Sequence, residues 1–471
     1  MLNPVTEAFV ATLRASLPEA AIRPTEPRYL DEPRGGPPGH AGLVVAPGSV
    51  EEVATVIRTA SQARVPVIPY AGGTGLVGGQ VTYQDPAPVI LSMERMNAIR
   101  AVYPLENVLI AEAGVILANV QTAAQEATRL FPLSLASEGS ARIGGLLGTN
   151  AGGVNVLRYG NARELCLGLE AVLPNGEIWH GLKRLRKDNT GYDLRNLLIG
   201  SEGTLGVITA AALRLFPRPA SEGAAFMVVP SPEAALSLLS RAKDIAGEAI
   251  SAFELISGVG LEFLAETMPQ VRLPFETPPD WMVLMDLGLS GGREASDVLE
   301  EIFAAGFEDG IVTDGLIAQS ESQRQEFWQV RESIPLANKL IGSISSHDIS
   351  VPLGLVPEFI TRGNEVFAQA GEYRINCFGH MGDGNLHYNI FPPKGVDKKT
   401  RIHEKSQVQS MVHDLASAME GSISAEHGIG RLKAADLQLY GDPTKLAAMR
   451  VLKDAFDPFG IMNPGAVLAS N

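Results

Sequence analysis

Three glycine-rich segments constrain this chain more than any other feature of its sequence. They cover residues 70–80, 138–153 and 198–209, and the first and third lie directly beside apolar, strand-like runs. A loop without side chains lets backbone N–H groups approach a phosphate closely. Together the three segments predict loops that wrap an extended, phosphorylated ligand.

The first segment contains the spacing G-x-G-x-x-G, from Gly73 to Gly78. In a dinucleotide-binding Rossmann fold these glycines would open a helix. Here residues 79–88 have no helical character, so the Rossmann interpretation is disfavoured. An ordinary glycine turn between strands is the alternative for this loop alone. The second segment places glycine pairs on both sides of Thr149-Asn150, and this repetition favours the ligand.

Length and charge exclude several classes of protein. A chain of 471 residues exceeds the usual size of a single core, so we expect two or three domains. The net charge of −15 argues against nucleic acid as a partner. The two cysteines form no C-x-x-C motif, so no disulfide framework is expected. No stretch is apolar and long enough for a transmembrane segment, and the N-terminus lacks a signal-peptide pattern, so we expect a cytoplasmic protein.

Two histidines bracket a Gly-Asp-Gly-Asn turn in the run from His380 to His387. These turn residues are poor helix formers, and an odd spacing in one straight strand would put the imidazoles on opposite faces. The chain must therefore turn if both are to face one point. Further along, Glu426 and His427 are adjacent. Two histidines and a glutamate make a divalent-metal set, with His427 left as a base. Separate, satisfied histidines in loops are the alternative.

Hydrophobic periodicity predicts a mixture of helices and strands. A first helix is expected from Asn3-Pro4 onward. A β-α-β pattern follows over 43–69, with a capping box at 49–52. Two strands joined by the turn 174–176 form a hairpin. After a polar Pro/Gly joint at 217–223, residues 226–318 follow the β-α-β-β-α-β order of a ferredoxin-like half.

At this point the chain resembles the FAD-binding PCMH-type flavoproteins of the vanillyl-alcohol-oxidase superfamily. Within them it resembles the D-2-hydroxy-acid dehydrogenases, on the D-2-hydroxyglutarate and D-lactate dehydrogenase branch. The resemblance covers nearly the whole chain. Its motifs are Pro69-Tyr-Ala-Gly-Gly-Thr-Gly75, Ile143-Gly-Gly with Thr149-Asn-Ala-Gly-Gly153, Leu185-Arg-Lys-Asp-Asn-Thr-Gly-Tyr-Asp-Leu194, Gly200-Ser-Glu-Gly-Thr-Leu-Gly206, His380 to His387, Glu426-His427 and Asn463-Pro-Gly465.

The resemblance implies an α+β fold with a two-subdomain PCMH-type FAD-binding domain, a ferredoxin-like cap domain and a C-terminal helical segment. The expected parts are an N-terminal helix and loop at 1–37, the FAD-binding domain at 38–217, the substrate and cap domain at 222–420, and a segment at 421–471 that returns to the FAD domain.

The resemblance also implies FAD. Relatives that link FAD covalently often do so through a histidine in the first loop, where this chain has Gly73 and Thr74, so the FAD is expected to be non-covalent. The residues implied in its binding are Pro69, Ala71, Gly72, Gly73, Thr74, Gly75, Leu76, Gly79, Ser137, Gly139, Ser140, Ile143, Gly144, Gly145, Thr149, Asn150, Gly152, Gly153, Tyr159, Gly160, Glu202, Gly203, Gly206, Val207, Ile208 and Asn463.

The implied activity is oxidation of a D-2-hydroxy acid to its 2-oxo acid. Arg331, on an expected helix, offers a guanidinium fork to the substrate carboxylate, and Asn385 and Ser346 are the other expected substrate contacts. A metal, with zinc as the expected ion, is held by the set His380, His387 and Glu426. It lowers the pKa of the substrate hydroxyl, His427 removes the hydroxyl proton, and hydride passes to flavin N5.

The chain departs from the family pattern at three places. Ala466 stands where Asn-Pro-Gly is usually followed by lysine. Pro335 and Ser346 stand where the hydroxyglutarate branch has threonine and lysine for the distal carboxylate. The departures at Pro335 and Ser346 put hydroxyglutarate in doubt as the physiological substrate, and any role of the family's lysine is missing at Ala466.

The expected partners are a small anionic 2-hydroxy acid and an electron acceptor, with an electron-transfer flavoprotein or the quinone pool as candidates. A homodimer is the expected assembly. Two other functions stay open from the residues alone. A zinc-dependent hydrolase would use the same His/His/Glu set to activate water, and a flavin-binding protein without catalysis would need only the glycine loops.

Overall fold

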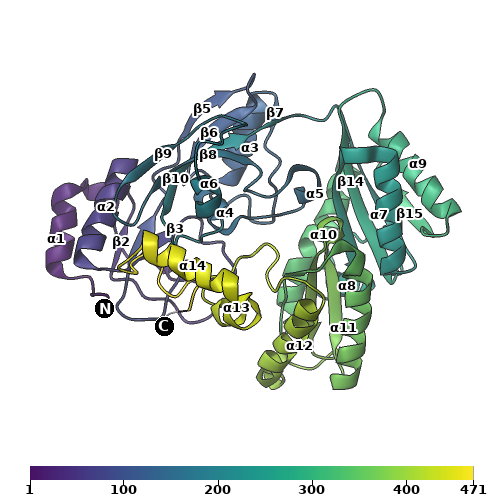
Figure 1. Ribbon diagram of the computed structural model, residues 1–471. Helices are drawn as coiled ribbons and strands as arrows, with labels where there is room; N and C mark the ends of the chain where they lie inside the picture. The colour runs from purple at the N-terminus through teal and green to yellow at the C-terminus, as the bar shows by residue number, and fades with distance from the viewer. Residues whose placement is uncertain (470–471) are drawn as a thin grey trace. The chain divides into compact units, whose positions relative to one another are not determined.

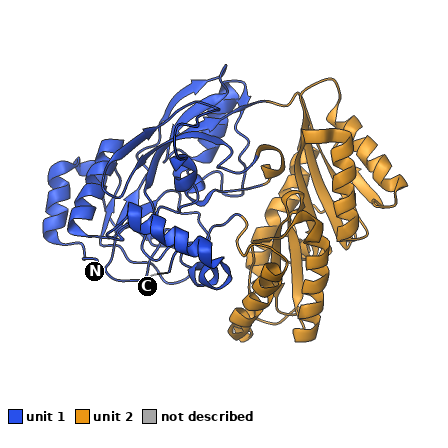
Figure 2. Ribbon diagram, viewed as in Figure 1, with its two compact units in different colours: residues 1–153, 160–217, 426–471 blue, residues 154–159, 218–425 orange. Residues whose placement is uncertain are grey.

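The structure is a computed structural model that describes residues 1–469, and it divides into two compact units (Figures 1 and 2). Unit 1 comprises residues 1–153, 160–217 and the chain from 426 onward, and unit 2 comprises residues 154–159 and 218–425. The chain passes from unit 1 to the main part of unit 2 between residues 217 and 218, within the Pro/Gly joint noted in the sequence. The short segment 154–159 was expected in the FAD-binding domain, but it packs with unit 2.

Unit 1 contains two larger sheets, as the two-subdomain prediction requires. The first has the order β1-β2-β4-β3, in which β4 pairs in parallel with β2 and β3. Its strands are β1 (Ile22–Arg23), β2 (Leu43–Val45), β3 (Val67–Tyr70) and β4 (Val89–Ser92), and its helices are α1 (Glu7–Ser16) and α2 (Val50–Ala63). Helix α2 begins as the capping box predicted, because the Ser49 side chain accepts a hydrogen bond from the Glu52 backbone N–H at 3.2 Å.

Helix α1 begins later than expected. Its N-cap is Thr6, whose hydroxyl accepts from the Phe9 N–H. Asn3 does not cap the helix, because its side-chain amide donates to the Ala63 carbonyl at 2.8 Å and ties the chain start to the end of α2. The prediction of a helix from Asn3 and Pro4 was therefore wrong in its starting residue.

The second sheet of unit 1 is antiparallel and has the order β5-β6-β10-β8-β9. Its strands are β5 (Ile99–Tyr103), β6 (Val108–Glu112), β8 (Cys166–Val172), β9 (Ile178–Gly181) and β10 (Val207–Arg214). The predicted hairpin at 174–176 joins β8 to β9. The accompanying elements are α3 (Leu117–Glu126), β7 (Arg129–Leu130), α4 (Ile143–Thr149), α6 (Leu194–Leu198) and β11 (Phe216–Pro217).

Both chain ends contribute to unit 1. Residues 1–37 share its core and supply β1, so they are not a separate part. The returning segment begins at Glu426, after the expected position 421, and carries α13 (Ala434–Tyr440) and α14 (Pro443–Phe456). It reaches β3, where the Val67 N–H donates to the Ile461 carbonyl and the Asn463 N–H donates to the Val67 carbonyl, both at 2.8 Å.

Unit 2 is built on a seven-stranded sheet of order β15-β12-β14-β13-β17-β18-β16. Its first four positions have the strand order and antiparallel pairing of a ferredoxin-like half, as predicted. The strands are β12 (Ser221–Val228), β13 (Ile250–Ser257), β14 (Trp281–Leu289), β15 (Asp314–Ile317), β16 (Ile349–Ser350), β17 (Arg374–His380) and β18 (Asn385–Phe391).

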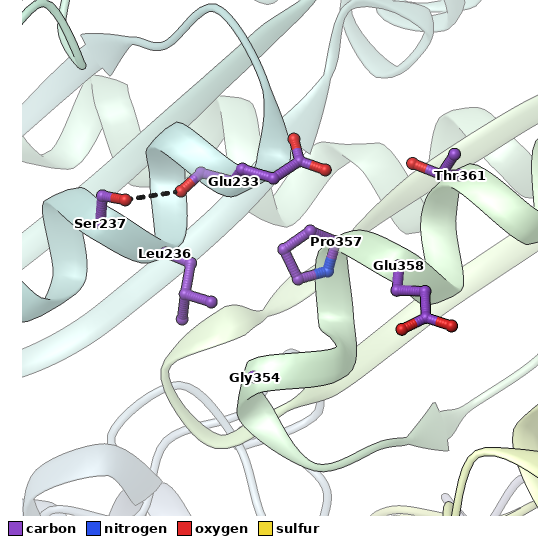
Figure 3. Close-up of a pocket in the computed structure, with 7 residues that line it drawn as sticks. All are labelled: Glu233, Leu236, Ser237, Gly354, Pro357, Glu358 and Thr361. Atoms are coloured by element: carbon purple, nitrogen blue, oxygen red, sulfur yellow. Dashed lines mark hydrogen bonds between the residues drawn. The ribbon is translucent and has the colours of Figure 1, made fainter.

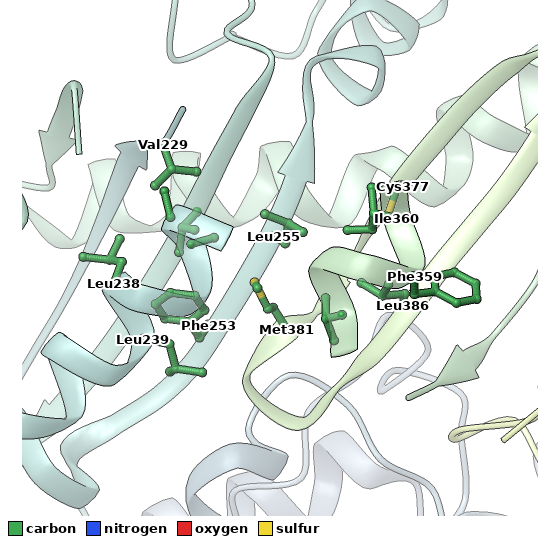
Figure 4. Packing of buried hydrophobic residues seen from close by; sticks show 14 of the residues in the cluster. Val229, Leu238, Leu239, Phe253, Leu255, Phe359, Ile360, Cys377, Met381 and Leu386 are labelled. Carbon is green, nitrogen blue, oxygen red and sulfur yellow. The ribbon is translucent and has the colours of Figure 1, made fainter. Parts of the chain in front are cut away.

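Helices cover both faces of this sheet. Side chains of α7 and α11 pack with Phe253, Leu255 and Leu386 in one core (Figure 4). On the opposite face, α8 and α10 pack with Ile256 and Phe378. The helices of unit 2 are α5 (Val156–Tyr159), α7 (Pro232–Ala246), α8 (Gly258–Thr267), α9 (Ala295–Glu308), α10 (Glu321–Ile341), α11 (Val356–Ala370) and α12 (Lys405–Ala418). Helix α8 is an insertion between the second and third strands of the ferredoxin-like order.

Among residues 1–469, none of the helices combines the length and the apolar character that a bilayer crossing requires.

The core of unit 2 gives a test of the packing. Leu255 is fully buried between β13 and the helices, whereas Leu316, in the same sheet, is 39% exposed. We expect Leu255→Ala to lower the free energy of unfolding by about 2–5 kcal/mol, through lost transfer energy and a residual cavity. Leu316→Ala is the control and should stay within about 0.5 kcal/mol of the parent. Calorimetric unfolding of both variants checks this, and equal midpoints would contradict the assigned burial.

Candidate active site

The first glycine-rich loop follows β3 and lies against the second. A Cβ on Gly72 would come 2.5 Å from the Ser140 carbonyl oxygen. Gly73 has φ +69°, and a Cβ there would come 2.1 Å from the Tyr70 hydroxyl. Both positions therefore require glycine, the first because of the neighbouring loop and the second because of its backbone conformation as well.

The third glycine-rich segment joins the other two. The Glu202 N–H donates to the Gly148 carbonyl of α4 at 2.8 Å. A Cβ on Gly203, which has φ +74°, would come 2.8 Å from Cγ of Pro69 at the end of β3. The second glycine-rich loop thus contacts the first and the third, and the third also lies against Pro69 at the base of the first loop, all within unit 1.

The returning C-terminal segment forms hydrogen bonds with the first and third glycine-rich loops. Arg431 donates through Nη1 to the carbonyls of Gly78 and Gly79, at 3.1 and 3.0 Å, and through Nη2 to Oδ1 of Asn463 at 2.7 Å. The Asn463 amide donates in turn to the carbonyls of Gly79 and Glu202, at 3.0 and 2.7 Å. Asn463 was predicted as a cofactor residue, and it fixes the backbone of two of the loops.

Glu202 was also predicted to bind the cofactor, but protein amides engage its carboxylate. The N–H groups of Ile429 and Gly430 donate to its two oxygens at 2.7 and 2.8 Å. Burial raises the pKa of Glu202, and these two hydrogen bonds act in the opposite direction. The contact holds the chain directly after Glu426 and His427 in unit 1.

The chemistry and shape of these loops fit the FAD implied by the sequence. A Cβ added to Gly139 or to Gly148 would meet nothing within 4 Å, so both glycines border open space. Backbone N–H groups in loops without side chains suit a pyrophosphate. Tyr159 is the exception among the predicted residues, because it belongs to unit 2 with the rest of 154–159.

In unit 2, β17 and β18 form a hairpin that carries the two histidines. His380 ends β17, and residues 381–383 make one turn of 3-10 helix before β18. Gly384 closes the turn with φ +82°. The imidazole rings of His380 and His387 lie 5.6 Å apart, centroid to centroid. The turn predicted between the histidines is confirmed, and it brings them together.

A buried glutamate that was not among the predicted residues organises this cluster. Glu254, on β13, lies directly opposite His380 in the strand register. Its Oε1 is 2.8 Å from Nδ1 of His380, and its Oε2 is 2.7 Å from Nη2 of Arg331. Burial raises the pKa of Glu254, but the charges and hydrogen bonds of His380 and Arg331 outweigh it and lower the pKa to about 2.

Arg331 lies on α10, as predicted, and is 5% exposed. Its Nε and Nη2 both donate to Oε2 of Glu254, at 2.8 and 2.7 Å, and its Cζ lies 4.8 Å from the Phe378 ring centroid. One edge of the guanidinium is therefore occupied by protein, and Nη1 is the group left for a substrate carboxylate. Pro335 lies in the same helix. Because proline has no backbone N–H, the Arg331 carbonyl does not receive the helical hydrogen bond that residue 335 would otherwise donate.

The other predicted substrate residues differ in their surroundings. Asn385 is buried, and its Nδ2 donates to Oδ1 of Asp348 at 3.0 Å and to the Ile349 carbonyl at 2.9 Å. Both amide hydrogens are thus engaged, which leaves Oδ1 for a ligand. Ser346 is exposed, and its hydroxyl lies 2.8 Å from that of Ser343.

Glu426 and His427 lie at the start of the last segment of unit 1. Oε2 of Glu426 accepts from the Gly153 N–H at 3.0 Å, which ties it to the second glycine-rich loop. Nε2 of His427 is 3.7 Å from Oε1 of Glu426. The preceding residue, Ala425, belongs to unit 2, where its N–H donates to the Asp348 carbonyl at 3.3 Å.

One sequence signal could have identified the missed glutamate. Glu254 is the only charged residue in the strand Ile-Ser-Ala-Phe-Glu-Leu-Ile-Ser of β13. A carboxylate in such a strand must find a partner or lose its charge, because burying an isolated charge is costly. Arg431 and Asp348, which were also not predicted, lie in loops whose sequence carries no comparable signal.

A surface hollow in unit 2 is distinct from this cluster. Its volume is about 510 Å³, and it lies between α7 and α11 on the other face of the sheet (Figure 3). Its lining residues are Glu233, Leu236, Ser237, Gly354, Pro357, Glu358 and Thr361. The lining has carboxylates but no cation and no histidine, so it does not suit an anionic hydroxy acid.

Two protein-family models match most of this chain. The FAD binding domain family matches residues 41–181, and the family of FAD linked oxidases, C-terminal domain, matches residues 218–467. The chain is 36% identical over 431 residues to the mitochondrial D-2-hydroxyglutarate dehydrogenase of Arabidopsis thaliana, covering 91% of this chain and 75% of that protein. It is 33% identical over 474 residues to D-2-hydroxyglutarate dehydrogenase of Xanthomonas citri pv. viticola, covering 99% and 98%.

A solved structure shows the same fold. The structure of p-cresol methylhydroxylase with substrate bound superimposes with a TM-score of 0.75 at 16% identity, covering 100% of this chain and 99% of that one. Neither the zinc hydrolase nor the non-catalytic flavin protein is supported by these relatives. The glycine loops of unit 1 and both family matches lead to one conclusion: the chain belongs to the FAD-linked oxidases and is an FAD-dependent oxidoreductase.

Proposed function

We propose that this protein oxidises a D-2-hydroxy acid to the corresponding 2-oxo acid with non-covalent FAD. The observation that carries the proposal is the cluster in which one buried carboxylate, Glu254, holds both His380 and Arg331 at 2.7–2.8 Å. A guanidinium is suited to a substrate carboxylate and an imidazole to a metal ion. The names of the relatives, which are D-2-hydroxyglutarate dehydrogenases, support the same chemistry.

Each side chain has a defined role in this proposal. Nη1 of Arg331 binds the substrate carboxylate, and Oδ1 of Asn385 accepts a hydrogen bond from the substrate. His427 takes the hydroxyl proton as general base. FAD, when bound, accepts the hydride that leaves C2. The O–H proton passes to His427 and the C2–H hydride passes to FAD with its two electrons, as the C2–O single bond becomes the carbonyl.

We further propose that His380, His387 and Glu426 hold a divalent cation, with zinc as the expected ion. Two imidazoles and a carboxylate are a common catalytic zinc set, and this set leaves a position for substrate. Nδ1 of His380 donates a hydrogen bond to Oε1 of Glu254 at 2.8 Å, and in this tautomer Nε2 is the nitrogen that binds a metal ion. Such a cation, when bound, acts as a Lewis acid that lowers the pKa of the substrate hydroxyl.

The electron acceptor, the homodimer and the cytoplasmic location stay predictions. An electron-transfer flavoprotein and the quinone pool are the candidate acceptors. The Arabidopsis relative is named mitochondrial, whereas the name of the Xanthomonas relative gives no compartment.

The first prediction concerns the flavin. The purified protein should be yellow, and its FAD should leave on acid or heat denaturation, because Gly73 and Thr74 stand where a linking histidine would be. The measurement is absorbance of the supernatant after precipitation. Flavin that remains with the precipitated chain would show a covalent link, and failure to bind added FAD on refolding would contradict the proposal as a whole.

The second prediction concerns the metal. His380→Ala, His387→Ala and Glu426→Gln should each lower metal content and turnover, while FAD stays bound in the glycine loops of unit 1. His403→Ala is the control, because His403 is a 74% exposed histidine side chain of unit 2 outside the proposed set. Metal analysis, flavin absorbance and turnover are measured on all four variants. Full turnover of a chelator-treated sample shown to be free of metal would refute the site.

The third prediction concerns the substrate. Pro335 lacks the hydroxyl of the usual threonine, and Ser346 lacks the positive charge of the usual lysine. A second substrate carboxylate would therefore be desolvated with fewer partners, so a short mono-acid such as D-lactate should compete well with D-2-hydroxyglutarate. Ser346→Lys should shift the ratio of kcat/KM toward the di-acid by about ten- to a hundredfold, since a hydrogen bond to a charged group contributes roughly 1.5–3 kcal/mol.

Ser343→Lys is the matched control for that substitution. It adds the same charge at the serine whose hydroxyl lies 2.8 Å from that of Ser346. A wild type that is already strongly selective for D-2-hydroxyglutarate, or an equal shift in both lysine variants, would show that another feature determines the preference.

A further inference from the structure

Glu254 is an unusual residue for its strand. It is 1% exposed, and it projects from apolar β13 toward the face covered by α8 and α10. A buried carboxylate is stable only when hydrogen-bonded and paired. Its two oxygens have two different partners, the His380 ring and the Arg331 guanidinium. Both partners belong to the proposed chemistry, although Glu254 itself binds neither substrate nor metal there.

The hydrogen bond to His380 determines which ring nitrogen carries the proton. An ionised carboxylate can only accept hydrogen bonds. The 2.8 Å contact between Oε1 of Glu254 and Nδ1 of His380 therefore places the proton on Nδ1. In this tautomer the lone pair lies on Nε2, which is the form in which imidazole binds a metal ion.

The second oxygen orients the arginine. Nε and Nη2 of Arg331 both donate to Oε2, and Cζ of Arg331 lies over the Phe378 ring, 4.8 Å from the ring centroid. These contacts fix the rotation of the guanidinium, so Nη1 projects from a defined position. One carboxylate thereby sets both the tautomer of a metal ligand and the direction of a carboxylate-binding group.

We propose that Glu254 is a positioning residue that holds His380 in its Nδ1–H tautomer and Arg331 in its substrate-binding orientation. This inference rests on the proposed function, because it assigns Glu254 a role toward the metal and substrate groups named there.

Glu254→Gln separates this role from simple packing. Glutamine has nearly the same shape, but one of its two terminal atoms is an NH2 group that only donates. If its oxygen faces Arg331, the NH2 group faces Nδ1 of His380 and forces the ring proton onto Nε2. If the amide is reversed, the NH2 group faces the guanidinium, which is also only a donor. Glutamine can therefore satisfy one partner but not both.

Asp286→Asn is the matched control. Asp286, on β14, is a 3% exposed carboxylate that accepts from Nε and Nη2 of Arg324 at 2.8 and 3.1 Å. Arg324 lies on α10, as Arg331 does, and the remaining partner is the indole N–H of Trp328 at 2.8 Å. The control thus weakens a buried ion pair on the same sheet and helix without touching a histidine.

The experiment measures zinc binding to chelator-stripped, FAD-loaded protein by competition with a chromophoric chelator. It also measures the affinity for oxalate from the flavin spectrum. We expect Glu254→Gln to weaken zinc binding about 10- to 100-fold and to weaken oxalate binding as well. Asp286→Asn should match wild type in both. Equal losses in the two variants, or unchanged zinc affinity in Glu254→Gln, would overturn the inference.

Zinc binding by His380→Ala distinguishes failure of the proposed metal site from failure of the role of Glu254. If His380→Ala retains wild-type zinc affinity, the proposed metal site is wrong. If His380→Ala loses zinc but Glu254→Gln does not, only the role of Glu254 is wrong.

A second measurement applies if Glu254→Gln does not fold. Long-range ¹H–¹⁵N spectra of metal-free wild type report the tautomer directly, and the signals of His380 are assigned because they are missing from the spectrum of His380→Ala. A proton on Nε2 there would refute the inference.

Discussion

Unit 1 depends on backbone segments that approach one another more closely than side chains would permit. A Cβ on Gly114 would come 1.9 Å from the Met93 carbonyl oxygen, and one on Gly72 would come 2.5 Å from that of Ser140. Glycine at such positions lets the backbones of strand ends and loops pack directly against one another. Glycine also adds no side chain to these loops, which suits the close approach of a long, phosphorylated cofactor to the backbone.

In unit 2 the corresponding constraint is strand register. The ferredoxin-like half is extended by β17 and β18, and the register places Glu254 opposite His380 and Phe378 opposite His387. Because side chains alternate across a strand, these groups share one face of the sheet while Leu255 packs into the core on the other. A shift by one residue would move the whole cluster into that core.

Features with local signals could be predicted from the sequence, and features created by tertiary pairing could not. The cap at Ser49, the glycine loops and the turn between His380 and His387 each depend on neighbouring residues. By contrast, Asn3 is a good cap by type, yet its amide donates to the distant Ala63 carbonyl, so the helix starts elsewhere. Glu254 became visible as an organising residue only when β13 was seen to pair with β17.

The two buried ion pairs of α10 show how a structural contact differs from a functional one. Arg324 and Arg331 are seven residues apart, two helical turns, and each meets a carboxylate of the sheet. Buried pairs add little net stability over apolar packing, but they specify how a helix docks. Asp286 binds only groups that dock α10, Arg324 and the Trp328 indole. Glu254 differs by adding an imidazole, a contact that docking does not require, so chemistry accounts for it better than packing does.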